Sequence, residues 1–243
     1  MGIPPWTLDL MAKYGAGNGR VLSAGYPDIV VPIEMAEEIV GKEVVAKVAR
    51  RADTKDLQQW HHADDVKEFL EAESLFKAMG YEGMDVLDVK AWRGGEIICD
   101  LNEPLSESLH GKYSMVIDPG TSEHVFHVGV SLISLASCVS QDGIIVQILP
   151  LTAFNHGLYC VSPTLLHSFY EENGFRIEWL FAVQRSKPHV QSSVYKVPAH
   201  KRFLKAPEET YLGLVARRVE MKKVGPIVQL KYKKKMNETD GNH

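Results

Sequence analysis

Cysteine is scarce in this chain, and its distribution argues against a disulfide-stabilised architecture. The three cysteines among 243 residues form no closely spaced pair, and each is embedded in apolar sequence: Cys99, Cys138 and Cys160. Isolated cysteines of this kind are typical of buried, reduced thiols, because oxidising compartments favour paired cysteines. We therefore expect free thiols and a cytoplasmic location.

The chain also lacks any long apolar run. No stretch of about 18 apolar residues, the length that a membrane helix needs, occurs in it. The opening segment 1–6 has neither the basic start nor the apolar stretch of a secretory signal. We expect no membrane association.

The net charge of the chain is also small, at -4, so the surface as a whole is not built to bind nucleic acid. The charge is uneven, however, because residues 216–235 hold eight Lys or Arg against the single Glu220. A solvated strand face followed by a frayed tail is the simpler interpretation. A patch for a polyanionic partner is the alternative.

Short apolar segments alternate with helical patterns along the chain. Strands are expected at 20–25, 84–89, 96–101, 113–118 and 144–149, and helices at 31–40, 44–80 with a loop near 51–56, 122–139 and 162–172. This alternation is what a parallel sheet covered on both faces requires. Two last strands, 175–184 and 210–219, are expected to pair antiparallel at the edge of the sheet, because few residues with a helical pattern separate them.

The pattern predicts an α/β fold: a Rossmann-like, doubly wound, mostly parallel seven-stranded sheet with an antiparallel edge strand. We expect one domain over residues 1–243, with a core at about 20–220, a helical insertion at about 44–80 and a basic tail at 220–243.

Acidic residues end two of the predicted strands. Ligands of open α/β sheets bind beyond the carboxyl ends of the strands, where Asp88 and Asp100 are expected. A carboxylate at Asp88 suits a ribose diol, and one at Asp100 suits an exocyclic adenine amine. Each alone is also typical of a turn or a helix cap. Together, behind the strand-ending Gly25, they favour an adenosine-type ligand.

A third polar cluster follows the strand at 113–118. It begins with Asp118-Pro119-Gly120 and places Glu123 and His124 on the opening turn of the predicted helix. A divalent ion is one use for such residues. Adjacent residues on a helix point about 100° apart, so Glu123 and His124 are a poor chelating pair without a remote third ligand. We expect no metal.

In combination, these segments resemble the class I S-adenosylmethionine-dependent methyltransferases, over about residues 20–183. The matching stretches are Val-Leu-Ser-Ala-Gly, Asp-Val-Leu-Asp ending at Asp88, Cys-Asp-Leu-Asn around Asp100, Ile-Asp-Pro-Gly-Thr-Ser-Glu-His-Val and Asp-Gly-Ile-Ile-Val. The resemblance implies S-adenosylmethionine as cofactor. It also implies the residues that hold the cofactor: Ala24, Gly25, Tyr26, Asp88, Asp100, Leu101, Asp118 and Gly120.

One departure from the family concerns the loop after the first strand. The family usually has an acidic residue and two or three glycines there, whereas this chain has Ser23-Ala24-Gly25-Tyr26-Pro27-Asp28. A catalytically silent binding or partner protein that kept the sheet is therefore the alternative to an enzyme.

Methyl transfer requires an aligned nucleophile and, where the nucleophile carries a proton, a base with a pKa near neutral. His124 after the fourth strand and His156 on the loop after the fifth are the candidate bases. A helix-capping role for His124 and a hydrogen bond from His156 to a loop carbonyl are the alternatives. Candidate substrate contacts are Glu123, His127, Asn155 and Tyr159.

The expected acceptor is a small or carbohydrate-like molecule. A nucleic-acid acceptor ranks below it, because the chain lacks an Asn-Pro-Pro-Tyr type signature. The sequence leaves the oligomeric state and the methylated atom open.

Overall fold

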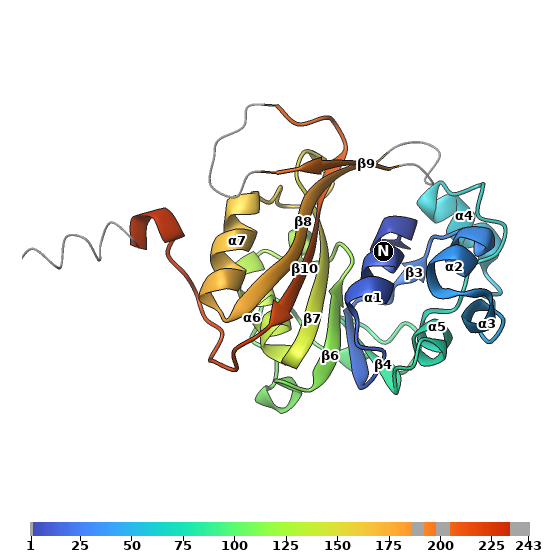
Figure 1. Cartoon of the computed structure of the whole chain (residues 1–243), viewed down its shortest axis with the longest axis horizontal. Coiled ribbons are helices and arrows are strands. Elements are labelled where there is room, and N and C mark those ends of the chain that lie inside the picture. The colour runs from blue at the N-terminus through green and yellow to red at the C-terminus, as the bar shows by residue number, and fades with distance from the viewer. Residues whose placement is uncertain (1, 186–191, 198–204, 234–243) are drawn as a thin grey trace, which may run out of the picture.

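The computed structural model describes residues 2–185, 192–197 and 205–233, and its centre is one eight-stranded sheet (Figure 1). The strand order is β5-β4-β2-β6-β7-β10-β8-β9. The strands are β2 (Arg20–Ala24), β4 (Gly83–Asp88), β5 (Ile97–Ile98), β6 (Tyr113–Asp118), β7 (Val139–Pro150), β8 (Phe175–Arg185), β9 (Ser192–Lys196) and β10 (Thr210–Arg218). A small second sheet pairs β1 (Gly2–Ile3) with β3 (Asp28–Ile29).

Strand directions confirm the predicted fold class. The pairs along β5-β4-β2-β6-β7 are all parallel. Strand β10 runs antiparallel to both of its neighbours, β7 and β8, and β9 pairs antiparallel with β8 at the edge. The sheet is therefore Rossmann-like and mostly parallel, with its antiparallel strands gathered at one side. It has eight strands instead of the predicted seven, because β9 adds an edge strand that the sequence pattern did not show.

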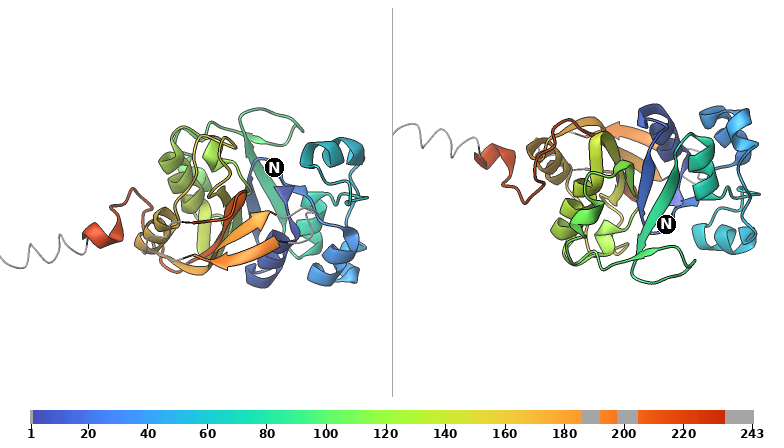
Figure 2. Two further views of the ribbon diagram at one scale, coloured as in Figure 1. Left: turned by 90° about the horizontal axis from the view of Figure 1, so that it is seen from above. Right: turned by 90° about the horizontal axis from the view of Figure 1, so that it is seen from below.

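Helices cover both faces of the sheet (Figures 1 and 2). On one face lie α1 (Pro5–Tyr14), α2 (Ile33–Val40), α3 (Lys42–Val45) and α5 (Ala72–Ala78), which share one apolar cluster with the sheet. On the other face lie α6 (Val128–Cys138) and α7 (Pro163–Glu172), which share another. Helix α4 (Thr54–His61) contributes to a smaller cluster through Leu57.

The core begins earlier in the chain than predicted. Leu8 and Met11 of α1 are fully buried against the sheet, although the sequence pattern placed the start of the core near residue 20. The segment before β2 is thus a structural part of the fold.

Helix α7 shows how local sequence sets element boundaries. The hydroxyl of Ser162 accepts a hydrogen bond from the backbone N–H of Thr164, and Pro163 occupies the first turn, where its missing N–H is not needed. The helix ends at Asn173, and Gly174 follows with a φ of 82°. Both predicted boundaries are confirmed.

The predicted helix 122–139 is wrong in its first third. A 3-10 turn, η2 (Ser122–His124), is followed by extended backbone at Val125, and α6 begins only at Val128. Val125 is 9 % exposed and belongs to the core cluster of that face, so the extended residue at the helix break packs into the core. Glu123 and His124 therefore lie on a tight turn of their own.

Two strand boundaries also differ from the prediction. The strand expected at 96–101 is reduced to β5, and β7 starts at Val139 instead of residue 144. Residues 141–143, between the predicted helix and the predicted strand, lie within β7, where Asp142 takes a φ of 60° and the pairing with β6 shifts register.

The three cysteines are free thiols in the structure. No helix in the described part of the chain is both long and apolar enough to span a bilayer.

Candidate functional site

The topological switch point of the sheet lies between β2 and β6. From β2 the chain builds β4 and β5 on one side, and from β6 it builds β7 on the other. Ligands of open α/β sheets bind at such a point, beyond the carboxyl ends of the strands. The loops after β2 and β6 are joined there, because the hydroxyl of Thr121 donates a hydrogen bond to the carbonyl oxygen of Ala24.

A cavity of about 380 Å³ opens beside the switch point, on the side of β6 and β7. Pro119 and Gly120 after β6, Ile148 of β7 and Tyr211 of β10 line it from the sheet. Trp6 of α1 and Trp60 of α4 line it from the helices. This volume falls in the usual range of roughly 300–1,000 Å³ for small-molecule sites.

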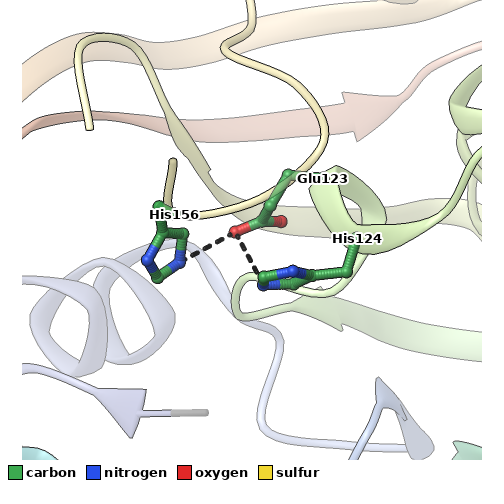
Figure 3. A group of neighbouring side chains, drawn as sticks. All are labelled: Glu123, His124 and His156. Carbon is green, nitrogen blue, oxygen red and sulfur yellow. Dashed lines mark ion pairs between the residues drawn. The ribbon is translucent and has the colours of Figure 1, made fainter. Parts of the chain in front are cut away.

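Glu123, His124 and His156 meet in this cavity (Figure 3). The Oε1 atom of Glu123 lies 4.0 Å from Nε2 of His124 and 3.5 Å from Nε2 of His156. The carboxylate is 0 % exposed, whereas the two imidazoles are 48 % and 42 % exposed. One buried acidic group thus faces two accessible histidines.

Close backbone packing positions His156. The N–H of Leu158 donates a hydrogen bond of 2.8 Å to the carbonyl oxygen of Glu123, which fastens the loop after β7 to η2. Gly157 permits this approach, because a Cβ atom there would lie 2.8 Å from Cγ of Glu123 and 2.9 Å from its carbonyl oxygen. The ring of His156 packs edge-on against Tyr211.

Asp118 anchors the loop that carries Glu123. Its carboxylate is fully buried and accepts hydrogen bonds from Thr121 N (2.9 Å), Ser122 N (3.3 Å), Ser122 Oγ (2.6 Å) and Gln147 Nε2 (2.9 Å). Burial raises the pKa of Asp118, and the nearby Glu123 adds to that rise. The predicted cofactor contact of this side chain conflicts with its position, since internal donors occupy the carboxylate.

Asp88 and Asp100 lie at the other side of the switch point, at the carboxyl ends of β4 and β5. Asp88 is partly buried and accepts a hydrogen bond of 3.3 Å from the indole N–H of Trp92. Asp100 is exposed, and hydrogen bonds from the backbone and side chain of Asn102 hold its pKa below the usual value. The pKa of the Cys99 thiol is raised, mainly by burial and also by the negative charges of Asp88 and Asp100.

The structure separates the remaining predicted cofactor residues from the cavity. Among the eight, only Gly120 belongs to its lining. Gly25 takes a φ of 77° and donates a hydrogen bond to the carbonyl oxygen of Leu87, and Leu101 is buried in the core. The ring of Tyr26 lies 3.7 Å from the guanidinium of Arg93, and its hydroxyl donates to Glu71.

Three predicted substrate contacts do not line the cavity. His127 lies after the helix break, at the start of α6, and its backbone N–H donates a hydrogen bond to Oδ1 of Asn102, near Asp100. Asn155 is exposed with a φ of 61°, and the Tyr159 hydroxyl donates to the carbonyl oxygen of Phe126. Glu123 alone of the predicted substrate set faces the cavity.

Trp6 and Tyr211, which line the cavity, were missed by the sequence reasoning. Trp60 and His61 also line it, although their sequence favours a solvated helix end over a lid that encloses substrate. The Pro4-Pro5-Trp6 opening is a recognisable helix start, but no local pattern shows that this helix packs beside the switch point.

No family model and no curated protein matches the sequence. Among solved structures, 1,6-didemethyltoxoflavin-N1-methyltransferase of Burkholderia thailandensis, solved with 1,6-didemethyltoxoflavin and S-adenosylhomocysteine, aligns at 14% identity over 89% of this chain and 76% of that chain, with a TM-score of 0.42.

Two further structures align over similar lengths. The 16S rRNA (adenine(1408)-N(1))-methyltransferase of Catenulisporales acidiphilia shares 11% identity over 90% of this chain and 95% of that chain, with a TM-score of 0.39. An S-adenosylmethionine-dependent methyltransferase of Mesorhizobium loti shares 12% identity over 88% and 98%, with a TM-score of 0.44. At these values the likeness decides neither activity nor acceptor, and the fold class rests on strand order and helix placement in the chain itself.

Proposed function

We propose that this protein is an S-adenosylmethionine-dependent methyltransferase that acts on a small-molecule or carbohydrate-like acceptor. One observation carries the proposal: carboxylates at the carboxyl ends of β4 and β5 lie on one side of the switch point, and a cavity with two accessible histidines lies on the other. A nucleoside-containing cofactor and an acceptor thereby have separate, adjacent places.

The residues on the β4–β5 side fit the nucleoside end of the cofactor. Asp88 has one weak internal donor and retains acceptor capacity for a ribose diol, and Asp100 is exposed for an adenine amine. The Trp92 ring, 68% exposed, stands beside Asp88 and offers an apolar surface for a base. Bound S-adenosylmethionine supplies an electrophilic methyl group.

The residues on the β6–β7 side fit an acceptor. Trp6, Trp60 and Tyr211 give the cavity apolar walls, and His124 and His156 present ring nitrogens to it. The Glu123 carboxylate lies beside both rings, and one of the two histidines takes the proton from the acceptor.

Calorimetric titration with S-adenosylhomocysteine tests the cofactor assignment. We expect binding by the wild-type protein and at least about tenfold weaker binding by Asp88→Ala, since a bidentate acceptor of the ribose is lost. The matched control is Asp9→Ala, which removes an exposed carboxylate of α1 far along the chain from the predicted site. Absence of binding at millimolar ligand would support the silent-protein alternative instead.

Turnover measurements test the acceptor side. Methyl transfer to a panel of hydroxylated small molecules is expected to fall by about 100-fold or more in His124→Ala or His156→Ala, while S-adenosylhomocysteine affinity stays within about twofold. Unchanged turnover in both variants would remove the catalytic assignment of these histidines.

A further inference from the structure

We propose that Glu123, His124 and His156 form a binding site for one divalent transition-metal ion of the zinc type. Two imidazoles and one carboxylate are a donor set that such ions use with open positions left for water or substrate. The sequence argued against a metal because an adjacent Glu–His pair lacks a remote third ligand. The fold supplies that ligand as His156, 33 residues beyond Glu123 in the chain.

The ligand atoms have nearly the spacing that an ion requires. One donor atom from each of the three residues lies within 4.8 Å of the other two, and the two distances from Oε1 of Glu123 are 4.0 and 3.5 Å. Bonds of about 2.0 Å to a tetrahedral ion put ligand atoms about 3.3 Å apart. Because both histidines are only half buried, small side-chain rotations are enough to close the remaining difference.

The state of the Glu123 carboxylate is the second, independent observation. Its side chain is 0 % exposed, and neither oxygen has a hydrogen-bond partner in the described part of the chain. A buried carboxylate that accepts no hydrogen bond is strongly unfavourable, so such groups are normally paired with a full positive charge or coordinate a metal. A cation held between Glu123 and the two imidazoles removes that penalty.

Two glycines keep the space around this carboxylate open. A Cβ atom at Gly120 would lie 3.1 Å from Oε1 of Glu123, and one at Gly157 would lie 2.8 Å from its Cγ. Gly120 also takes a φ of 99°, which disfavours any side chain there. The exposed sides of both imidazoles face the cavity, so the unfilled coordination positions of an ion point toward the place proposed for the acceptor.

This inference stands on the three side chains and does not depend on S-adenosylmethionine binding. It does alter the role of the histidines. With an ion bound, His124 and His156 would be its ligands and not bases. The ion would then lower the pKa of an acceptor hydroxyl at an open position, and the proton would pass to solvent water.

Metal titration of the untagged full-length protein tests the proposal without any activity assay. Co²⁺ reports coordination through its visible absorption, and Zn²⁺ binding is measured by calorimetry. We expect one ion per chain, a higher melting temperature with Zn²⁺, and much weaker binding of Mg²⁺, which prefers oxygen ligands.

Substitutions then assign the ligands. Glu123→Gln keeps the volume of the side chain, and His156→Ala removes the remote ligand. Each is expected to weaken Zn²⁺ binding by about tenfold or more and to reduce the Zn²⁺-dependent rise in melting temperature. The matched control is His110→Ala, an exposed histidine outside the cluster, which should bind Zn²⁺ as the wild type does. His124→Ala replaces either variant that melts below the assay temperature.

The proposal is overturned if wild-type protein gives no Co²⁺ absorption, or if the ligand variants bind like the control. Methyl-transfer results leave this conclusion untouched, so a failed metal site and a failed methyltransferase assignment are told apart.

Discussion

Arg218 is one of the eight basic residues near the C-terminus, and its side chain is 4% exposed. Its guanidinium donates hydrogen bonds to the carbonyl oxygens of Ser137 (3.1 Å), Val139 (2.7 Å) and Lys222 (2.9 Å). Ser137 lies in the last turn of α6 and Val139 begins β7, where helical carbonyls lack donors within the helix. The N–H of Gly111 also donates to the carbonyl oxygen of Ser137. The interpretation of this segment as a solvated strand face is therefore wrong for Arg218.

Its neighbour Arg217 also has structural partners. It forms an ion pair with Glu178 and donates to the carbonyl oxygens of Tyr14 and Asp142. Lys234 and Lys235, which belonged to the same predicted basic segment, lie outside the described residues. Arg217 and Arg218 are therefore engaged within the fold, which leaves fewer basic side chains for a polyanionic partner.

Replacing Arg218 with Met removes its hydrogen bonds to the carbonyl oxygens of Ser137, Val139 and Lys222, of which Ser137 keeps the N–H of Gly111 as a donor. We expect a loss of about 2–4 kcal/mol in the free energy of unfolding, measured by urea denaturation. Arg176→Met is the matched control, because Arg176 is exposed and pairs only with Glu178 among its described charged neighbours. A similar loss in both variants would contradict the capping role.

At the scale of single elements, Glu71 begins helix α5. Its carboxylate accepts hydrogen bonds from the backbone N–H groups of Glu73 (3.0 Å) and Ser74 (2.6 Å) and from the Tyr26 hydroxyl. Burial raises the pKa of Glu71, but these hydrogen bonds outweigh it and hold the pKa below the ordinary value. The charged form is therefore the form that stabilises the helix start.

The Glu71→Gln variant tests this cap through its pH dependence. A folded-state pKa that is lowered contributes stability above the unfolded pKa of about 4.3, and that stability is lost as the pH falls through the folded value. We expect the free energy of unfolding of the variant to be about 1 kcal/mol lower than that of the wild type at pH 7, and the difference to shrink below about pH 4. Urea denaturation at pH 7 and pH 3 measures both, and exposed Glu82→Gln is the control. A difference that persists unchanged at pH 3 would sink the assignment.

The close contact between η2 and the loop after β7 can be tested at Gly157. Gly157→Ala is expected to push this loop off Glu123, because its Cβ atom would meet Glu123 at 2.8 Å. We predict about tenfold weaker Zn²⁺ binding with the melting temperature of the ion-free protein nearly retained. Gly129→Ala is the control, since no described atom lies within 4 Å of its Cβ position. Equal Zn²⁺ affinity in both variants would show that the loop contact does not set the site.

At the scale of the whole molecule, helix α1 near the N-terminus packs against β10, the strand of the main sheet that comes last in the sequence. The Trp6 and Trp179 rings stack at a centroid distance of 5.9 Å, and a Cβ atom at Gly213 of β10 would lie 2.6 Å and 2.4 Å from them. Residues from three distant parts of the chain thus pack together beside the cavity that Trp6 lines.

Gly213→Ala is expected to force these rings apart. Overpacking of this kind costs about 1–3 kcal/mol, and the displaced indoles should change the intrinsic tryptophan fluorescence of the folded protein. Gly225→Ala, with no described atom within 4 Å of its Cβ position, should change neither. An unchanged fluorescence spectrum and an unchanged free energy of unfolding for Gly213→Ala would contradict the prediction, because the two tryptophan rings would then accommodate the added Cβ atom.

Much of the fold was predictable because it depends on short-range patterns. The apolar run of β6, the Ser162 cap and the Asn173-Gly174 stop of α7, and the order of strands and helices follow from local burial and backbone preference. The break between η2 and α6 was not predictable, because Val125 packs into the core cluster that α6 and α7 share with the sheet, and the sequence pattern does not show this contact.

The candidate site divides along the same line. Sequence alone determined that acidic and imidazole groups stand at strand ends, since parallel strands bring their carboxyl ends to one edge of a sheet. Only the tertiary structure decided that His156 reaches Glu123, that His127 turns away, and that Trp6 closes the cavity, because each depends on packing between segments far apart in the chain. Periodicity sets which face of an element is buried, but contacts between elements set which side chains meet.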